Sequence, residues 1–465
     1  MLDPKRVLLA AGLLFAVAPG WANQVPPSGS NLAGATLVPL PVLGGDRVTA
    51  GSAFNPDISV ILDAVYYNEL GTEFDEPAGF EGGHSHGHGG HDHGHGLEEG
   101  FNFRSAELAF TASVDKYFDA MLMLHLDEHG VEVEEGYAAT RNLPAGFRVK
   151  AGKFFSDIGY INAQHAHDWA FVDRPLVNEF LFGDHGIQEV GVQLTWTPNT
   201  PFYSVFGVEL LQGETEGIAP YVGADRVQHV TVTPHPDTGD PVRNRWRADN
   251  PFDDVSGPRL ITGFAKFGPD LGYDHAAQFG LSYGYSRAFQ RDDLHSSLRY
   301  EAWDGTAWFA GVDAVYKYEA GRPYGHGDFT LQGEYFYREI DADFVEKRFR
   351  GGDFVTTEAL RRTAKQDGLY LQGLYGIAPR WQAGLRLEAL GLTNTNALVE
   401  DDFFRSFDTS YRYSGNLTFR PTEFSMLRAQ LNYMDYATDD DRRDDGWAFM
   451  LQLQVALGVH GAHKF

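Results

Sequence analysis

The chain has 465 residues and no cysteine, so disulfide bonds are excluded. Its formal net charge of −27 argues against a nucleic-acid partner and favours cations. The mean hydropathy of −0.32 is polar although aromatic residues make up 14% of the sequence, a combination typical of transmembrane β-barrels, in which only every second strand residue meets lipid.

The N-terminal residues have the pattern of a secretory signal peptide. A basic start, MLDPKR, is followed by a short apolar run and by GWA, with cleavage expected after Ala22. Residues 23–56 are rich in Pro, Gly and Ser, so we expect a flexible periplasmic leader there. No later segment approaches the about 20 apolar residues that a membrane-spanning helix needs. The predicted organisation is a signal peptide (1–22), a leader (23–56) and an exported β-barrel (57–465).

From residue 57 onwards, hydrophobic and polar residues alternate with a period of two, which predicts β-strands. The sequences YRYSGNLTFR (411–420) and WQAGLRLEA (381–389) are examples. Candidate strands lie near 57–70, 100–114, 118–128, 131–141, 146–155, 186–197, 202–213, 259–268, 275–289, 306–319, 328–339, 367–378, 381–391, 409–420, 424–436 and 446–459. We predict an all-β, antiparallel transmembrane barrel of about 16 strands, with 14 or 18 as the alternatives, because such barrels have an even strand number.

The connections between these strands alternate in length. Short ones contain DKY, NLPAG, TPNTP, APR and RPTE. The long ones are 71–99, 156–185, 214–258, 290–305, 340–366, 392–408 and 437–445, and a brief DEHG at 127–130 is the exception. Short periplasmic turns and long extracellular loops are the layout of outer-membrane barrels, so we expect the chain to lie in the lipid of an outer membrane.

The loop 71–99 contains the sequence EGGHSHGHGGHDHGHG at 81–96. Glycine spacing leaves the imidazoles mobile, and neutral imidazole suits Zn²⁺, Cu²⁺ and Ni²⁺. The candidate ligands are His84, His86, His88, His91, Asp92, His93 and His95. The stretch is expected to bind metal readily and to select poorly among metals. The alternative is a solvated low-complexity tract with incidental metal affinity.

A second set of candidate ligands lines the predicted lumen. In the strand MLMLHLDEH the leucines take the lipid face, so Met121, Met123, His125, Asp127 and His129 would point inward. Glu132 and Glu134 would return on the same face of the next strand. This row predicts a path for a metal ion, and its alternative is ordinary lumen packing of His and carboxylate pairs.

The connection 156–185 is too apolar for a bare surface loop. It is the third extracellular loop by position, and in porins this loop commonly folds into the barrel. We therefore expect it inside the lumen, with His165, His167 and Asp168 at the constriction as further metal ligands. The alternative is that these side chains form hydrogen bonds that pin the loop to the barrel wall. Lumen residues Arg386, Arg412, Arg420 and Arg428 would form a basic wall facing an acidic one, which would suit zwitterionic or anionic organic solutes.

The signal peptide, GKFFSDIGYINAQHAHDW, FVDRPL and the final Phe465 resemble Gram-negative porin-type barrels. Within these, the chain is similar to a group with a His-rich first loop, described as zinc-regulated outer-membrane, TonB-dependent-like receptors. The resemblance implies metal acquisition, insertion by the barrel assembly machinery and, by analogy with porins of about 16 strands, a homotrimer. Segment 23–56 leaves no room for the plug of true TonB-dependent receptors, so TonB coupling is not expected.

The leading functional hypothesis is an outer-membrane channel or receptor for divalent transition-metal ions, with Zn²⁺, or else Ni²⁺ or Cu²⁺, as the captured or transported ion and no tightly bound cofactor. The alternative is a general or organic-solute porin whose His-rich loop only buffers metal. The Ser and His residues form no recognisable catalytic constellation, so we do not expect an enzyme.

Overall fold

The computed structural model describes residues 56–71, 76–80, 97–128, 130–224, 229–234, 241–246, 252–295, 299–350, 353–356, 359–398, 403–439 and 441–458. All of them lie in the second of the two units into which the chain divides, Leu37–Phe465. The predicted signal peptide, almost all of the leader and the His-rich stretch fall outside these residues and stay predictions. Within the described ranges no helix is long and apolar enough to cross a membrane.

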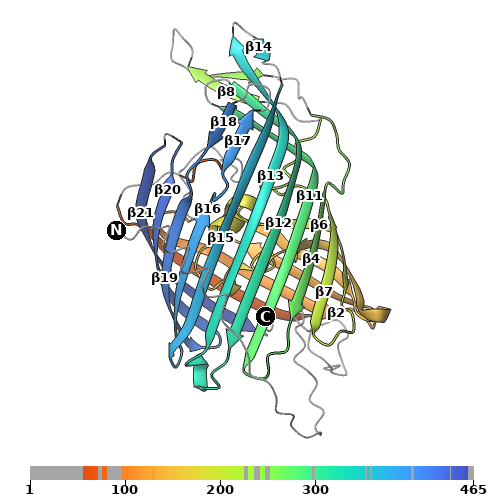
Figure 1. Cartoon of the computed structure of the whole chain (residues 1–465), viewed down its shortest axis with the longest axis vertical. Helices are drawn as coiled ribbons and strands as arrows, with labels where there is room; N and C mark the ends of the chain where they lie inside the picture. The colour runs from red at the N-terminus through yellow and green to blue at the C-terminus, as the bar shows by residue number, and fades with distance from the viewer. Residues whose placement is uncertain are drawn as a thin grey trace. The chain divides into compact units, whose positions relative to one another are not determined.

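Sixteen of the described strands form one closed antiparallel barrel (Figure 1). The strands are β1 (Asp57–Glu69), β2 (Gly100–Ser113), β3 (Phe118–Leu126), β4 (Val131–Thr140), β5 (Phe147–Phe155), β6 (Gln188–Trp196), β7 (Tyr203–Leu211), β10 (Leu260–Gly268), β11 (His275–His295), β12 (Arg299–Tyr318), β13 (Phe329–Arg350), β15 (Leu360–Ala378), β16 (Trp381–Leu390), β19 (Ser410–Thr422), β20 (Ser425–Ala437) and β21 (Arg443–Gly458). The ring closes where β1 pairs with β21. Closure removes unpaired strand edges, which the lipid phase requires.

The remaining described elements extend or connect the barrel strands. Short strands β14 (Asp353–Thr356), β17 (Thr395–Leu398) and β18 (Phe403–Ser406) belong to the same sheet, whereas β8 (His229–Pro234) and β9 (Pro241–Trp246) form a separate hairpin. The helical segments are η1 (Pro144–Gly146), η2 (Ala166–Asp168), α2 (Leu176–Phe182) and η3 (Pro323–Gly325).

Two predicted loops are strands in the structure. β11 and β12 continue to the pair His295–Arg299, and β13 continues to Arg350, so the loop predictions for 290–305 and 340–366 were wrong over most of their length. An antiparallel ladder satisfies the backbone in water as well as in lipid, so pairing need not stop where the membrane does. Figure 1 shows these strands extending beyond the rest of the barrel wall.

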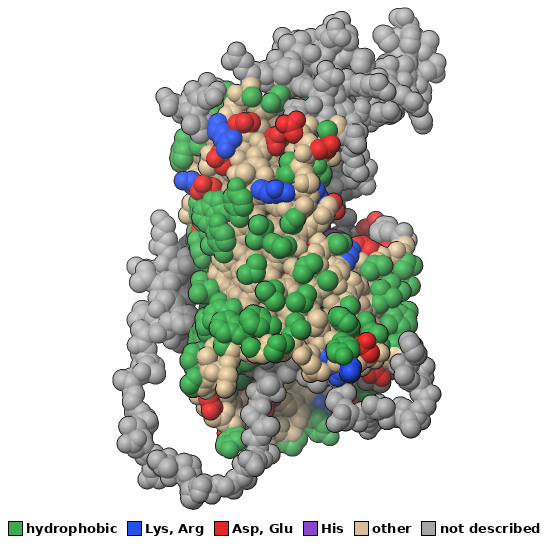
Figure 2. All heavy atoms as spheres, turned by 90° about the vertical axis from the view of Figure 1, so that its right-hand side faces the viewer, with side chains coloured by type: hydrophobic (Ala, Val, Ile, Leu, Met, Phe, Trp, Pro, Cys, Tyr) green, Lys and Arg blue, Asp and Glu red, His purple; other side chains and the backbone are tan. Residues whose placement is uncertain are grey.

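The outer wall of the barrel is apolar and the inner wall is polar. On β16, Leu385 is 70% exposed outward while its neighbours Arg386 and Glu388 are buried inside. Figure 2 shows hydrophobic side chains covering the wall, with charged side chains gathered toward its ends. Exposing such an apolar wall to water is unfavourable, so the barrel spans a membrane. The end that carries the short turns corresponds to the periplasmic end of outer-membrane barrels.

Leu385→Arg should destabilise the folded barrel by about 2–4 kcal/mol, because Leu385 lies near the middle of the lipid-facing wall. The measurement is the free energy of unfolding from lipid vesicles in denaturant. Leu271→Arg is the matched control, because Leu271 is exposed in the turn between β10 and β11, outside the lipid band. Equal losses for both variants would show that Leu385 does not face lipid.

The connection between β5 and β6 fills the lumen, as the sequence predicts. Most residues from Ser156 to Phe182 are buried, including every residue of α2, whereas residues 166–170 are half-buried. α2 lies against the inner faces of β13, β15 and β16. Apolar residues such as Phe171 and Leu176 therefore pack against the barrel wall and not against solvent.

Candidate metal centre

The lumen loop, residues 156–187, is held at its neck by Asn162. The Asn162 amide nitrogen donates to the carbonyls of Ser156 (2.8 Å) and Ile187 (3.1 Å), and its oxygen accepts from the Ile187 N–H at 2.9 Å. Such a bidentate clamp joins the two ends of the loop and satisfies buried backbone groups. Each polar group of the side chain is used, so the position demands an amide.

On one side the loop rests against β11 and β13. The Gly159 N–H donates to Ser282 Oγ at 2.9 Å, and the Tyr160 N–H donates to the buried Glu334 carboxylate. Gly159 has φ +56°, and a Cβ there would lie 2.4 Å from Glu334 Oε1. Glycine is required because the backbone both adopts a left-handed conformation and approaches the wall closely.

On the opposite side the loop is anchored by Asp173. Its carboxylate is fully buried and forms ion pairs with Arg386 and, at 3.2 Å, with Arg412. It also accepts hydrogen bonds of 2.7 Å from the amides of Gln430 and Asn432. Two arginines of the predicted basic wall thus serve to hold the loop, which corrects their interpretation as residues facing a solute.

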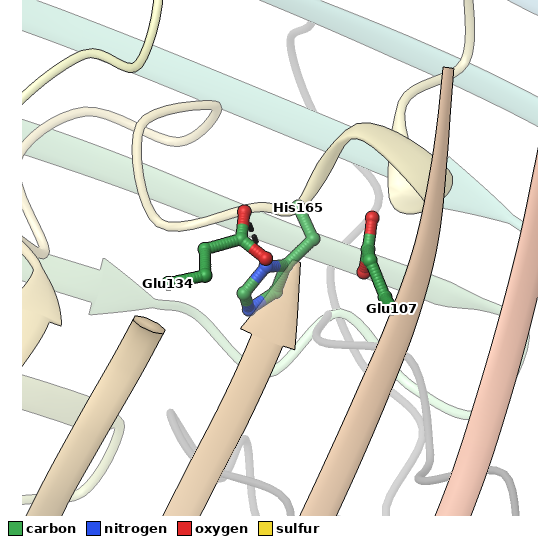
Figure 3. Close-up of side chains that lie close together, drawn as sticks. All are labelled: Glu107, Glu134 and His165. Carbon is green, nitrogen blue, oxygen red and sulfur yellow. Dashed lines mark ion pairs between the residues drawn. The ribbon is translucent and has the colours of Figure 1, made fainter. Parts of the chain in front are cut away.

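These anchors place His165 between two carboxylates of β4. His165 is 6% exposed, its Nε2 lies 3.0 Å from Glu135 Oε2, and its Nδ1 lies 3.3 Å from Glu134 Oε1. Ligand atoms of Glu107, Glu134 and His165 all lie within 4.8 Å of one another. Figure 3 shows the Glu134 carboxylate beside the imidazole and Glu107 on its other side.

His167 extends this cluster. Its Nδ1 lies 2.5 Å from Glu107 Oε2, and its Nε2 lies 3.6 Å from Asp168 Oδ1. The His165 and His167 rings stack with centroids 5.5 Å apart and an interplanar angle of 9°. The pair His-x-His therefore lies on one side of the loop, as its spacing predicts. We name Glu107, Glu134, Glu135, His165, His167 and Asp168 the lumen cluster.

A β-bulge explains why two consecutive glutamates reach one histidine. The register of β3 with β4 shifts between Met123 and Leu124, so that Met123 pairs with Glu135 and Leu124 with Val133. Glu134 is the extra residue, and at a bulge neighbouring side chains no longer alternate strictly between faces. Both Glu134 and Glu135 therefore contact His165 from the same strand.

The carboxylates of the lumen cluster favour the protonated form of both imidazoles, His165 and His167. Burial lowers the pKa of His165, but the Glu134 and Glu135 carboxylates outweigh burial and raise that pKa well above its ordinary value. For His167, burial again opposes the charge, and Glu107 and Asp168 raise the pKa. A divalent cation would bring the carboxylates the same total positive charge as two protonated imidazoles, but concentrated at one point.

The donor set suits a transition-metal ion. Imidazole nitrogen and carboxylate oxygen are the ligand types that Zn²⁺ accepts besides thiolate. His165 Nδ1 pairs with Glu134 Oε1 at 3.3 Å, whereas the second Glu134 oxygen, Oε2, is buried without a hydrogen-bond partner. Buried polar atoms are normally hydrogen-bonded, so this carboxylate oxygen is available to a cation.

Of the other predicted ligands, those that the structure describes pair outside the lumen cluster. His125 lies 3.8 Å from Asp127 at the end of β3, and Asp127 Oδ1 accepts the Gly130 N–H at 2.9 Å, as in a turn cap. Glu132 forms a 2.9 Å ion pair with Lys153. Glu132 thus pairs with a lysine and not with the lumen cluster, and its role as a metal ligand stays a prediction. His129, together with His84, His86, His88, His91, Asp92, His93 and His95, lies outside the described residues.

Two members of the lumen cluster, Glu107 and Glu135, were not predicted from the sequence. Glu107 occupies the polar face of β2 and pairs in register with His125, so the alternation of RSAELAF places it in the lumen. Its partner His167 is 60 residues away in the chain, and only the folded loop brings them together. Glu135 was missed because a regular strand would point it away from Glu134.

One short sequence, GLSYG at 280–284, matches the GxSxG pattern of hydrolases. In hydrolases the serine sits on a sharp turn between a strand and a helix. Here Ser282 lies within β11, and its Oγ accepts the Gly159 N–H. The serine holds the lumen loop against the wall.

Several solved structures resemble the chain at low sequence identity. In-vitro folded OmpT, an outer membrane protein of Vibrio cholerae, has a TM-score of 0.47 and 9% identity over 89% of this chain and 100% of that chain. The outer membrane channel DcaP of Acinetobacter baumannii has a TM-score of 0.47 and 11% identity over 87% of this chain and 96% of that chain. OprB of Pseudomonas putida has a TM-score of 0.46 and 12% identity over 87% and 94%.

No profile of a known protein family matches the chain. An uncharacterized protein of Aquifex aeolicus (strain VF5) is 35% identical over 433 residues, which cover 91% of this chain and 83% of that protein. Identity at this level over nearly the whole barrel is a family relationship. The chain belongs to the same family as this Aquifex aeolicus protein.

Proposed function

We propose that the protein is an outer-membrane channel that admits divalent transition-metal ions, with zinc as the cargo. The observation that carries the proposal is the lumen cluster, where imidazoles and carboxylates from β2, β4 and the inward loop converge. It lies where the lumen loop meets β2 and β4, so an ion crossing the barrel would pass close to it. Within the cluster, Glu134 Oε2 is buried without a hydrogen-bond partner and is available to a cation.

The mechanism that we propose is capture followed by exchange. The net charge of −27 raises the concentration of cations near the protein, and the His-rich stretch at 81–96 collects transition metals. An ion then reaches Glu134 and His165, displaces protons and leaves again, because conduction requires weak and multiple binding. Assembly as a homotrimer, insertion by the barrel assembly machinery and independence from TonB stay predictions.

Zinc influx into liposomes tests this proposal. Vesicles that carry the full-length refolded barrel and an enclosed zinc indicator should show faster zinc entry than vesicles without protein. Mg²⁺ entry, measured with its own indicator, should be slower, because imidazole ligands discriminate against Mg²⁺. Heat-modifiable gel mobility verifies that the barrel is folded. A folded barrel that admits no zinc, or that admits Mg²⁺ equally well, would contradict metal selectivity.

A further inference from the structure

A cavity of about 300 Å³ lies inside the barrel between the lumen loop and the periplasmic turns. Its roof consists of loop residues such as Trp169 and Ala170, and its floor includes Phe424 and Ser425 beside the turn that joins β19 to β20. The wall curves from β12 to β1 through β13, β15, β16, β19, β20 and β21. The volume is at the small end of the range for sites that bind small molecules.

Three cationic side chains line this cavity. Arg420 is solvent-exposed and its Nη1 donates to the Gln382 amide oxygen at 3.4 Å. Arg428 is 1% exposed and donates to Thr418 Oγ1 (3.1 Å) and Gln452 Oε1 (2.9 Å). The third cation is Lys317, on β12. Within the described part of the chain, no carboxylate forms an ion pair with either arginine.

The bonding of Arg428 is incomplete for a buried guanidinium. Its Nη2 meets only the Met426 sulfur, at 3.3 Å, and thioether sulfur is a weak acceptor. A buried charge is costly unless it is paired. Among the cavity-lining residues, the acidic side chains are Asp168 in the roof and Glu423 in the floor, against three fixed cations. The cavity therefore favours an anion, whereas the lumen cluster favours a cation.

We propose that this cavity is a binding site for a small organic dianion of the carboxylate class. Arg420 and Arg428 come from adjacent strands, and Lys317 comes from a strand four positions away around the barrel, so two cationic poles face one space. Two carboxylates at the ends of a short carbon chain match these poles, and arginine binds a carboxylate through paired N–H donors. Leu374, Trp169 and Phe424 supply apolar surface for the carbon chain.

This inference goes beyond the proposed transport of metal and does not depend on it. The anion would bind on the periplasmic side of the lumen loop, with His167 and Asp168 in the roof of the same cavity. A dianion at this position would neutralise the cations that a metal ion meets after it leaves the lumen cluster.

Titration calorimetry with succinate tests the site, using the full-length barrel in detergent after metal has been removed with a chelating resin that is then separated from the protein. Succinate should bind at one site per chain, whereas its uncharged analogue succinamide should not. Arg420→Gln should weaken succinate binding severalfold, because one of the two guanidiniums that bind the carboxylate is lost. Arg361→Gln is the matched control, since Arg361 pairs with Asp341 and Asp343 away from the cavity.

Several outcomes would overturn the proposal: no succinate binding to the folded wild-type barrel, equal binding of succinamide, or equal losses in Arg420→Gln and Arg361→Gln. Tighter binding of inorganic phosphate than of succinate would also overturn the carboxylate class. If Arg420→Gln does not fold, Lys317→Gln and the comparison of succinate with succinamide on the wild type decide the question. Because metal is absent from the titration, a negative result leaves the zinc-flux experiment unaffected.

Discussion

Asp173→Asn should increase the single-channel conductance of the barrel severalfold and lower its stability by about 3–5 kcal/mol. The wild-type carboxylate is fully buried and pairs with Arg386 and Arg412, and Glu388 pairs with both arginines as well. Asparagine keeps the shape of the side chain but leaves the two buried guanidiniums with Glu388 and, at 4.0 Å from Arg412, Glu179. The lumen loop would then be held to β16 and β19 by hydrogen bonds without its buried ion pairs, and the space that it fills would open to ions more often.

Planar-bilayer recordings give the conductance, and the temperature at which heat-modifiable mobility is lost reports stability. Asp343→Asn is the matched control, because Asp343 pairs with Arg361 at an exposed position where ion pairs contribute about 0–1 kcal/mol. Wild-type conductance and stability in Asp173→Asn would mean that Asp173 does not hold the loop in the lumen.

Glu134→Gln should weaken zinc binding to the lumen cluster by at least about tenfold, as should His165→Asn. Losing even a residue that only orients a metal ligand typically costs about 10–100-fold in affinity, and Glu134 and His165 are proposed to contact the ion directly. The substitutions are made in a barrel that lacks Gly82–Gly96, so that the His-rich stretch does not mask the lumen site. Competition with a chromophoric zinc chelator measures the affinity.

Glu132→Gln is the matched control for Glu134→Gln. The same substitution is made two residues away on β4, at a glutamate that pairs with Lys153 and not with His165. His275→Asn controls for the loss of a histidine, because His275 Nδ1 lies 2.7 Å from Tyr316 Oη at the periplasmic end of the barrel. If Glu132→Gln lowers zinc affinity as much as Glu134→Gln, the ligands follow the row predicted from alternation and not the lumen cluster.

The alternation of residues determined the strands and their faces. In WQAGLRLEA, Leu385 lies outside and Arg386 and Glu388 lie inside, as the period of two predicts. This part of the fold is predictable because each strand residue meets either lipid or the lumen, and the pattern is local. The apolar character of 156–185 likewise predicted a loop inside the barrel, since its large side chains need a surface to pack on.

Contacts between distant segments decided the strand lengths and the assembly of the lumen cluster. The lengths of β11, β12 and β13 depend on how far their partners continue the ladder, so their composition alone suggested loops at 290–305 and 340–366. The pairing of Glu107 with His167 depends on where the inserted loop comes to rest. The joint contact of Glu134 and Glu135 with His165 depends on a one-residue shift of register. A sequence pattern records which face a residue prefers, whereas only the closed barrel and its inserted loop bring residues from three segments to one point.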